Sequence, residues 1–176
     1  LTIEENKTGD VREGVLEFRC KGKTIELRVK QNYDIEAVAI ADENFLAALV
    51  ESYDTDGDGI LSTKEASEIR KIECSGKGIS NMSELATYFT EITYLDCSNN
   101  SLTELDVTKL TKLEYLDCSG NDLKELDIQR LQKLTTLDCT DNANLAKIYV
   151  WFNFVAPDGF TKPETAEYVE PSIAAP

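Results

Sequence analysis

Leu95-Asp96-Cys97-Ser98 is repeated as Leu116-Asp117-Cys118-Ser119 and then as Leu137-Asp138-Cys139-Thr140, twenty-one residues further along each time. Self-similarity at such a period is typical of solenoids, in which no single unit can bury its own apolar face. The repeat therefore predicts stacked coils, each with one short strand. Each copy is completed by an Asn, expected to hydrogen-bond the backbone between coils, and by a Leu. These residues are Asn100 and Leu102, Asn121 and Leu123, and Asn142 and Leu145.

A fourth copy precedes these three. Ile72-Glu73-Cys74 fits the same frame with Lys77 at the Asn position, so four coils are expected over residues 72–145. The pattern L-x-x-L-x-C-x-x-N-x-L resembles the leucine-rich repeat, with Cys at one of the Leu positions. The predicted fold class is an α/β solenoid, a right-handed coil with a parallel β-sheet. Ile148-Tyr149-Val150-Trp151 is expected to form the last strand, within a C-terminal cap over residues 146–176 that covers the solenoid end.

Four of the five cysteines follow the repeat and are expected to point inward from successive coils: Cys74, Cys97, Cys118 and Cys139. Neighbouring strands lie about 4.8 Å apart, which leaves disulfide bonding between adjacent coils open. Free buried thiols are the favoured interpretation, because parallel inward side chains rarely reach the dihedral angle of a disulfide.

The first 33 residues are predicted to form strands. Residues 1–3 form a candidate strand, and residues 15–20 and 24–29 alternate on either side of Lys21-Gly22-Lys23, as in a hairpin. The segment resembles the final strands of BACON-type immunoglobulin-like domains, which implies the end of a preceding domain. No site residue is carried over from that resemblance.

Residues 34–71 are predicted to form a calcium-binding cap. A helix over 42–53, with Asp42 as its N-cap, leads into a twelve-residue acidic loop, and a second short helix follows over 65–71. The loop matches the EF-hand pattern, in which carboxylates surround a hard cation and a glycine permits the sharp turn. The alternative is an acidic loop that holds no ion. The expected Ca²⁺ ligands are Asp54, Asp56, Asp58, the carbonyl of Ile60 and Glu65.

This ion is expected to be structural. Sensor EF-hands usually occur in pairs and expose a Met-rich groove. The chain has one such loop and one Met. Because the second helix leads directly into the first coil, calcium is expected to fix the N-terminal cap to the solenoid.

Composition narrows the classes of function. The 18 Lys and Arg residues against 33 Asp and Glu residues give a formal net charge of −15, which argues against binding to nucleic acid or to an anionic membrane surface. The absence of histidine excludes Ser/His triads, Cys/His dyads and His-containing metal sites. No run of eighteen apolar residues is present, so no membrane insertion is expected. No pair of carboxylates stands out as a general acid, and no enzymatic activity is predicted.

Side chains that point outward from the strands are the candidate partner-binding residues. They form an acidic row beside tyrosines on the expected concave face, suited to a basic protein segment or a glycan. The alternative is a solvated sheet face whose polar residues merely oppose aggregation. The candidate residues are Lys71, Glu73, Tyr94, Asp96, Tyr115, Asp117, Thr136 and Asp138.

Residues 34–176 resemble secreted Bacteroidetes leucine-rich repeat proteins with an EF-hand-like N-terminal cap. The matching segments include Ile40 to Phe45, Asp54 to Glu65 and Leu95 to Asn100, and the cysteine column resembles that of some listerial internalins. The resemblance implies export and binding at the surface, so we expect a secreted or outer-surface protein, such as a lipoprotein, that binds a protein or glycan. We also expect the chain to be a monomer. The alternative role is a structural spacer in a longer multidomain surface protein.

Overall fold

A computed structural model describes residues 12–20, 23–31 and 36–171, with side chains from residue 36 onward, and the chain divides into two compact units, Leu1–Ala37 and Val38–Pro176. In the first unit, β1 (Arg12–Cys20) and β2 (Lys23–Gln31) pair antiparallel, from Cys20 opposite Lys23 to Arg12 opposite Gln31. The predicted hairpin is confirmed. The candidate strand at residues 1–3 lies outside the described residues, and the likeness to a BACON-type domain stays a prediction.

The second unit begins with two helices on either side of the acidic loop. Helix α1 (Glu43–Tyr53) starts at Asp42, whose carboxylate accepts hydrogen bonds from the amides of Asn44 and Phe45. Helix α2 (Thr63–Glu68) starts at Ser62, which shares a reciprocal capping box with Glu65. Both predicted helices are present, and the second begins and ends earlier than the sequence indicated.

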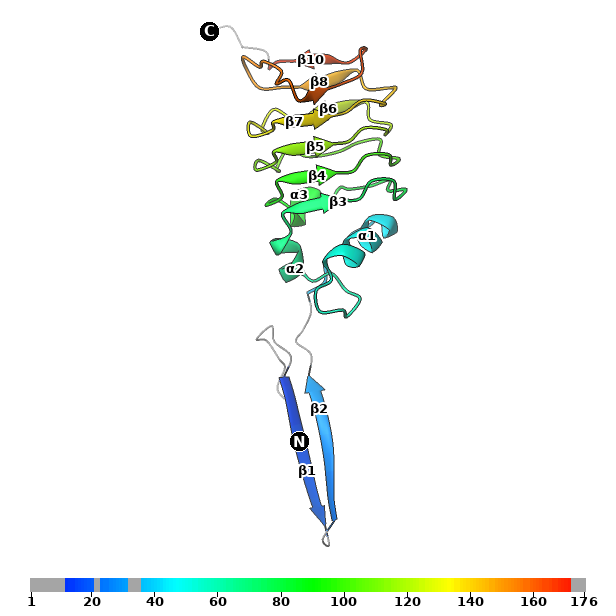
Figure 1. Ribbon diagram of the computed structural model, residues 1–176, viewed down its shortest axis with the longest axis vertical. Helices are drawn as coiled ribbons and strands as arrows, with labels where there is room; N and C mark the ends of the chain where they lie inside the picture. The colour runs from blue at the N-terminus through cyan, green and yellow to red at the C-terminus, as the bar shows by residue number, and fades with distance from the viewer. Residues whose placement is uncertain (1–11, 21–22, 32–35, 172–176) are drawn as a thin grey trace. The chain divides into compact units, whose positions relative to one another are not determined.

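A five-stranded parallel sheet follows α2 in the order β3-β4-β5-β7-β9. Figure 1 shows β3, β4, β5 and β7 stacked one above another, with α1 and α2 at the β3 end. The central residue of each of the first four strands is buried and its two neighbours are not, which is the period of two that the repeat predicts. The strands are β3 (Lys71–Glu73), β4 (Tyr94–Asp96), β5 (Tyr115–Asp117), β7 (Thr136–Asp138) and β9 (Phe160–Thr161).

The solenoid continues into the segment expected to be a cap. A second parallel sheet has the order β10-β8-β6, formed by β6 (Glu125–Asp127), β8 (Lys147–Tyr149) and β10 (Glu167–Val169). The prediction that residues 148–151 form the last strand is wrong, because β9 and β10 follow β8 and extend both sheets. Helix α3 (Leu85–Tyr88) lies in the longer first coil.

The core is a set of columns, each formed by the same position in successive coils. Ile72, Leu95, Leu116 and Leu137 are almost fully buried, and so are the four cysteines of the repeat. These cysteines are free, and the thiols of Cys74, Cys97 and Cys139 donate to carbonyl oxygens of the next strand at 3.3 to 3.5 Å. Burial raises the pKa of Cys74 and Cys139 to about 12, so these thiols are held in their unreactive protonated form.

The repeat Asn side chains connect the coils, as predicted. The amide of Asn121 donates to the carbonyl oxygens of Cys97 and Cys118 and accepts from the backbone N–H of Leu102. Asn142 makes the equivalent bonds one coil further on, and Asn100 one coil earlier. Each of the three amides is therefore satisfied by two coils at once.

Candidate functional site

The structure gathers three predicted calcium ligands. Carboxylate oxygens of Asp54, Asp56 and Asp58 all lie within 4.8 Å of one another. Gly57 and Gly59 have φ values of 73° and 83°, and their amides donate to Asp54 at 2.7 and 2.8 Å. These left-handed conformations suit glycine and let the chain turn tightly around the three carboxylates. This donor set, made only of oxygens, is the chemistry that Ca²⁺ prefers.

Glu65 is not part of this group of three. Its Oε1 accepts from the amide and hydroxyl of Thr55, both at 2.7 Å, and its Oε2 accepts from the amide and hydroxyl of Ser62 at 3.0 and 2.9 Å. Partial burial acts to raise the pKa of Glu65, but these hydrogen bonds outweigh it and lower the pKa to about 2. The carboxylate is therefore ionised and held across the loop, between Thr55 near its start and Ser62. The side chain of Ile60, the remaining predicted ligand through its carbonyl, is 40% exposed.

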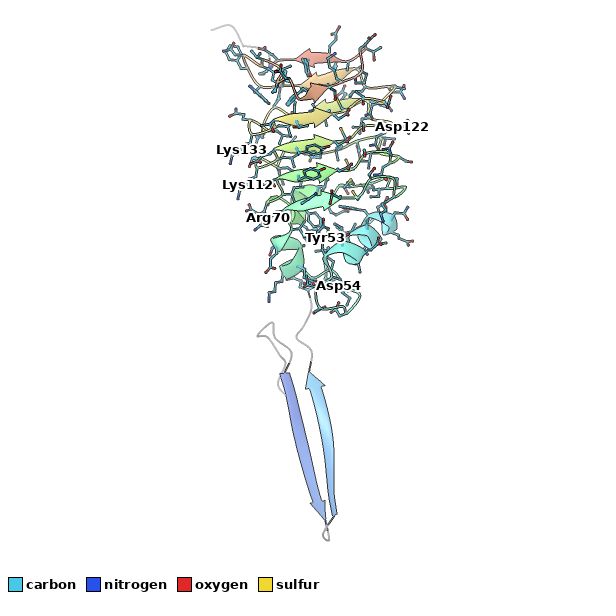
Figure 2. The ribbon with its side chains drawn as sticks, viewed as in Figure 1. Tyr53, Asp54, Arg70, Lys112, Asp122 and Lys133 are labelled. Carbon is cyan, nitrogen blue, oxygen red and sulfur yellow. The ribbon has the colours of Figure 1, made fainter. Side chains whose placement is uncertain are left out.

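Helix α1, which leads into the loop, is hydrogen-bonded to the first strand of the sheet. Figure 2 labels Tyr53 beside β3 and Asp54 at the start of the loop. The hydroxyl of Tyr53 donates to the backbone carbonyl of Lys71, the first residue of β3. Position in the sequence gave no sign of this contact, because the two residues are separated by the whole loop and by α2.

The predicted partner-binding residues lie in two rows across the five-stranded sheet. Strand pairing sets Lys71, Tyr94, Tyr115 and Thr136 side by side, and likewise Glu73, Asp96, Asp117 and Asp138. The rings of Tyr94 and Tyr115 are stacked, with centroids 4.1 Å apart and planes 3° from parallel. The ammonium of Lys71 lies 4.5 Å from the centroid of the Tyr94 ring and 2.8 Å from a carboxylate oxygen of Glu73.

The acidic row also has a local role that the sequence reading missed. Oδ1 of Asp96 accepts from both the amide and the hydroxyl of Ser98, at 3.0 and 2.7 Å. Asp117 and Asp138 bind Ser119 and Thr140 in the same way. The recurrent spacing of Asp followed by Ser or Thr two residues later was the available signal. One oxygen of each carboxylate thus fixes the turn after the strand, and only the other is left for a partner.

Comparison with known proteins agrees with this geometry. A family profile described as "Leucine Rich repeats (2 copies)" matches residues 90–128. The fold is a leucine-rich repeat solenoid. No curated protein matches the chain significantly. Among the described residues, no helix is long and apolar enough to cross a membrane.

Two solved structures of Listeria monocytogenes internalins resemble the leucine-rich repeat chain. One is internalin InlF, at 15% sequence identity and a TM-score of 0.42, over 62% of this chain and 43% of the internalin. The other is the functional domain of InlJ, which includes a cysteine ladder, at 17% identity and a TM-score of 0.34, over 80% of this chain and 50% of the other. The chain thus spans half or less of the length of each internalin chain.

Proposed function

We propose that this chain is a non-enzymatic binding module that recognises a protein through the outer face of its five-stranded sheet. Leucine-rich repeat solenoids are typical of protein-binding modules, because stacked coils present an extended surface. The observation that carries the proposal is the half-buried pair Tyr94 and Tyr115, aligned in register beside the acidic row. A secreted or surface location is part of the proposal and rests on the sequence resemblance to exported repeat proteins.

The stacking geometry favours a protein over a glycan. Sugars bind aromatic side chains by lying flat on an exposed ring face. One face of Tyr94 is covered by Tyr115 and the ring also carries the Lys71 ammonium, while the far side of Tyr115 borders Thr136. The rings therefore offer mainly edges and hydroxyl groups, which suit hydrogen bonding to a polypeptide. The remaining carboxylate oxygens of the acidic row favour a ligand with basic side chains.

A binding screen tests this proposal. The full chain is immobilised and probed with candidate host proteins and, in parallel, with a glycan array. Any protein that binds is measured again with Tyr94→Ala/Tyr115→Ala. We expect its affinity to fall tenfold or more, about 1.4 kcal/mol of binding free energy, because the aromatic pair is lost. Tyr115→Phe keeps the stack and is the matched control for the ring.

The screen can contradict the proposal in two ways. Unchanged affinity in the double alanine variant, with an unchanged melting temperature, would move the binding site off this face. Binding to glycans alone would overturn the choice of ligand class. A chain that captures neither ligand would favour the structural spacer, the alternative role.

We propose in addition that the acidic loop binds Ca²⁺ and stabilises the N-terminal end of the solenoid. The gathered carboxylates of Asp54, Asp56 and Asp58 support this, since they would repel one another without a cation. Glu65 and the carbonyl of Ile60 would complete the oxygen donor set predicted from the sequence. Helix α2 begins within the loop, at Thr63, and ends at Glu68, shortly before β3 begins at Lys71, so an ordered loop would hold the chain that leads into the first strand.

Thermal unfolding with and without calcium checks this second proposal. An ion at one hundred times its Kd adds about 2.7 kcal/mol of stability, and each kcal/mol raises the melting temperature of a unit this size by roughly 2 to 4 °C. We therefore expect chelation by EDTA to lower the melting temperature by about 5 °C or more. Glu65→Gln should lower it somewhat in EDTA, because the hydrogen bonds to Thr55 and Ser62 are weakened, and should lower it further in calcium, where the ion also loses a ligand. The neighbouring Glu68→Gln should behave as wild type. An unmoved melt in EDTA would refute calcium binding.

A further inference from the structure

A pocket of about 440 Å³ lies on the second-sheet side of the solenoid. It draws residues from four successive coils, including β6 and β8, and none of them belongs to the strands of the five-stranded sheet. The rows proposed for ligand binding therefore lie elsewhere on the molecule. The lining residues are Asn81, Met82, Ser83, Glu104, Leu105, Asp106, Thr108, Glu125, Asp127 and Tyr149.

The walls of the pocket carry four carboxylates and no cation. Neither Lys nor Arg is among the lining residues, and none of the three described salt bridges involves these carboxylates. Asp106 uses Oδ1 to accept from the amide and hydroxyl of Thr108, and Asp127 uses Oδ1 to accept from the amide of Gln129. The second oxygen of each remains for a ligand, as do both oxygens of the exposed Glu104. The pocket is thus strongly negative.

The pocket also has an apolar floor and an aromatic wall. Met82 and Leu105 are 2% and 7% exposed, so their side chains close the base of the pocket. The hydroxyl of Tyr149 donates to Oε2 of Glu125 at 3.2 Å, which orients both side chains at the rim. A ligand with a cationic end and an aliphatic stem matches this combination of charge and apolar surface.

The spacing of the carboxylates argues against a metal ion. Among the residues that the structure describes, only Asp54, Asp56 and Asp58 form a group of three acidic or metal-ligating side chains within 4.8 Å of one another. The pocket carboxylates are too far apart to share one small cation in this way. The volume fits an organic cation, which spreads its charge over several atoms.

We propose that this pocket receives an arginine or lysine side chain of a partner polypeptide. The cationic group lies among Glu104, Asp106, Glu125 and Asp127, its stem packs on Met82 and Leu105, and Tyr149 borders it. Charge-assisted hydrogen bonds to the free carboxylate oxygens supply the attraction. The pocket is a second contact surface, so a ligand on the five-stranded sheet and a basic segment here can be bound at the same time.

The test uses the ¹⁵N-labelled full chain and three blocked peptides, Ac-Gly-Arg-Gly-NH₂, Ac-Gly-Lys-Gly-NH₂ and the neutral Ac-Gly-Gln-Gly-NH₂. We expect saturable amide shifts around residues 81–83, 104–108, 125–127 and 149 with the two basic peptides and none with the neutral one. Glu104→Gln/Glu125→Gln should weaken binding fivefold or more. Glu114→Gln/Glu164→Gln removes the same charge at two exposed residues outside the pocket and should leave the affinity within twofold of wild type.

Several results would overturn the proposal. Equal weakening in both double variants would mean that only the net charge of the chain attracts the peptide. Saturable shifts confined to other residues, or no saturable shifts, would remove the site. Shifts of the same pocket amides by CaCl₂ at lower concentration would assign the pocket to a metal ion. Tyr94→Ala/Tyr115→Ala should leave the peptide affinity unchanged, which separates this result from the fate of the proposed binding face.

Discussion

At the scale of single residues, one backbone position in each coil requires a left-handed conformation. It recurs at Gly76, Asn99, Gly120 and Asp141, with φ values of 66°, 54°, 63° and 53°. Gly, Asn and Asp are the residues that tolerate this conformation best. The residue type at this one position therefore specifies the turn after each strand. The same turn places the repeat Asn where its side chain can hydrogen-bond to the preceding coil.

A substitution at this position should lower the stability most in the coil where the new side chain also meets a neighbouring residue. A Cβ at Gly120 would lie 2.7 Å from Oδ1 of Asn99, whereas a Cβ at Gly76 would meet nothing within 4 Å. We expect Gly76→Ala to lower the free energy of unfolding by about 1 kcal/mol through backbone strain alone. Gly120→Ala should lower it by about 2 kcal/mol, because the Asn99 side chain must also move. Urea unfolding measures the free energy of unfolding of both variants. Equal decreases would show that the Asn99 side chain moves aside at no cost in stability.

At the scale of elements, the cap of α1 also holds the helix to the first coil. One oxygen of Asp42 caps the helix, while the other accepts from the amide and hydroxyl of Ser80 at 2.8 Å and from the amide of Asn81 at 3.1 Å. The sequence indicated only the first role. Partial burial acts to raise the pKa of Asp42, but these hydrogen bonds outweigh it and the pKa is lowered.

The lowered pKa predicts how this link depends on pH. Because the unfolded chain binds the proton more readily, the charge of Asp42 stabilises the fold above the unfolded pKa of about 3.9. Its contribution is lost as the pH falls below that value and through the folded pKa. We expect Asp42→Asn, which keeps a capping side chain, to cost about 1 kcal/mol at pH 7 and much less near pH 3.

Urea unfolding at a series of pH values checks this expectation. Asp122→Asn is the matched control, because Asp122 is exposed and Figure 2 shows it on the loop edge of the solenoid, away from α1. The control should show no such change with pH. A cost for Asp42→Asn that stays constant down to pH 3 would mean that the carboxylate charge does not stabilise the link.

At the scale of the whole molecule, the net charge of −15 is unevenly distributed. Figure 2 shows Arg70, Lys112 and Lys133 along the edge of the sheet where the strands begin. Lys112 pairs there with Glu91 of the preceding coil at 2.6 Å. The acidic row and the acidic pocket lie on other surfaces. Both proposed contacts therefore attract basic partners, with part of their negative charge offset by Lys71 beside Glu73 and by Lys109 acting on Asp106.

Much of the fold could be predicted because the repeat acts through local rules. The spacing of Leu95, Leu116 and Leu137 fixed both the inward column and the register of the strands, and the structure pairs these residues directly. The segment after Leu145 lacks the pattern. Strand β9 joins the sheet with Phe160 opposite Leu137, through backbone hydrogen bonds that require no particular side chain.

The sequence by itself determined the stacked coils, the buried Cys and Asn columns and the residues of the acidic loop, since each depends on spacing along the chain. Only the tertiary structure decided which surfaces remain open. The facing sides of the Tyr94 and Tyr115 rings are covered because neighbouring coils lie close enough for the two rings to stack, with centroids 4.1 Å apart. The acidic pocket exists because four coils bring Ser83, Asp106, Asp127 and Tyr149 together. Contacts of this kind depend on the distance between coils, and the spacing of residues along a single coil does not determine that distance.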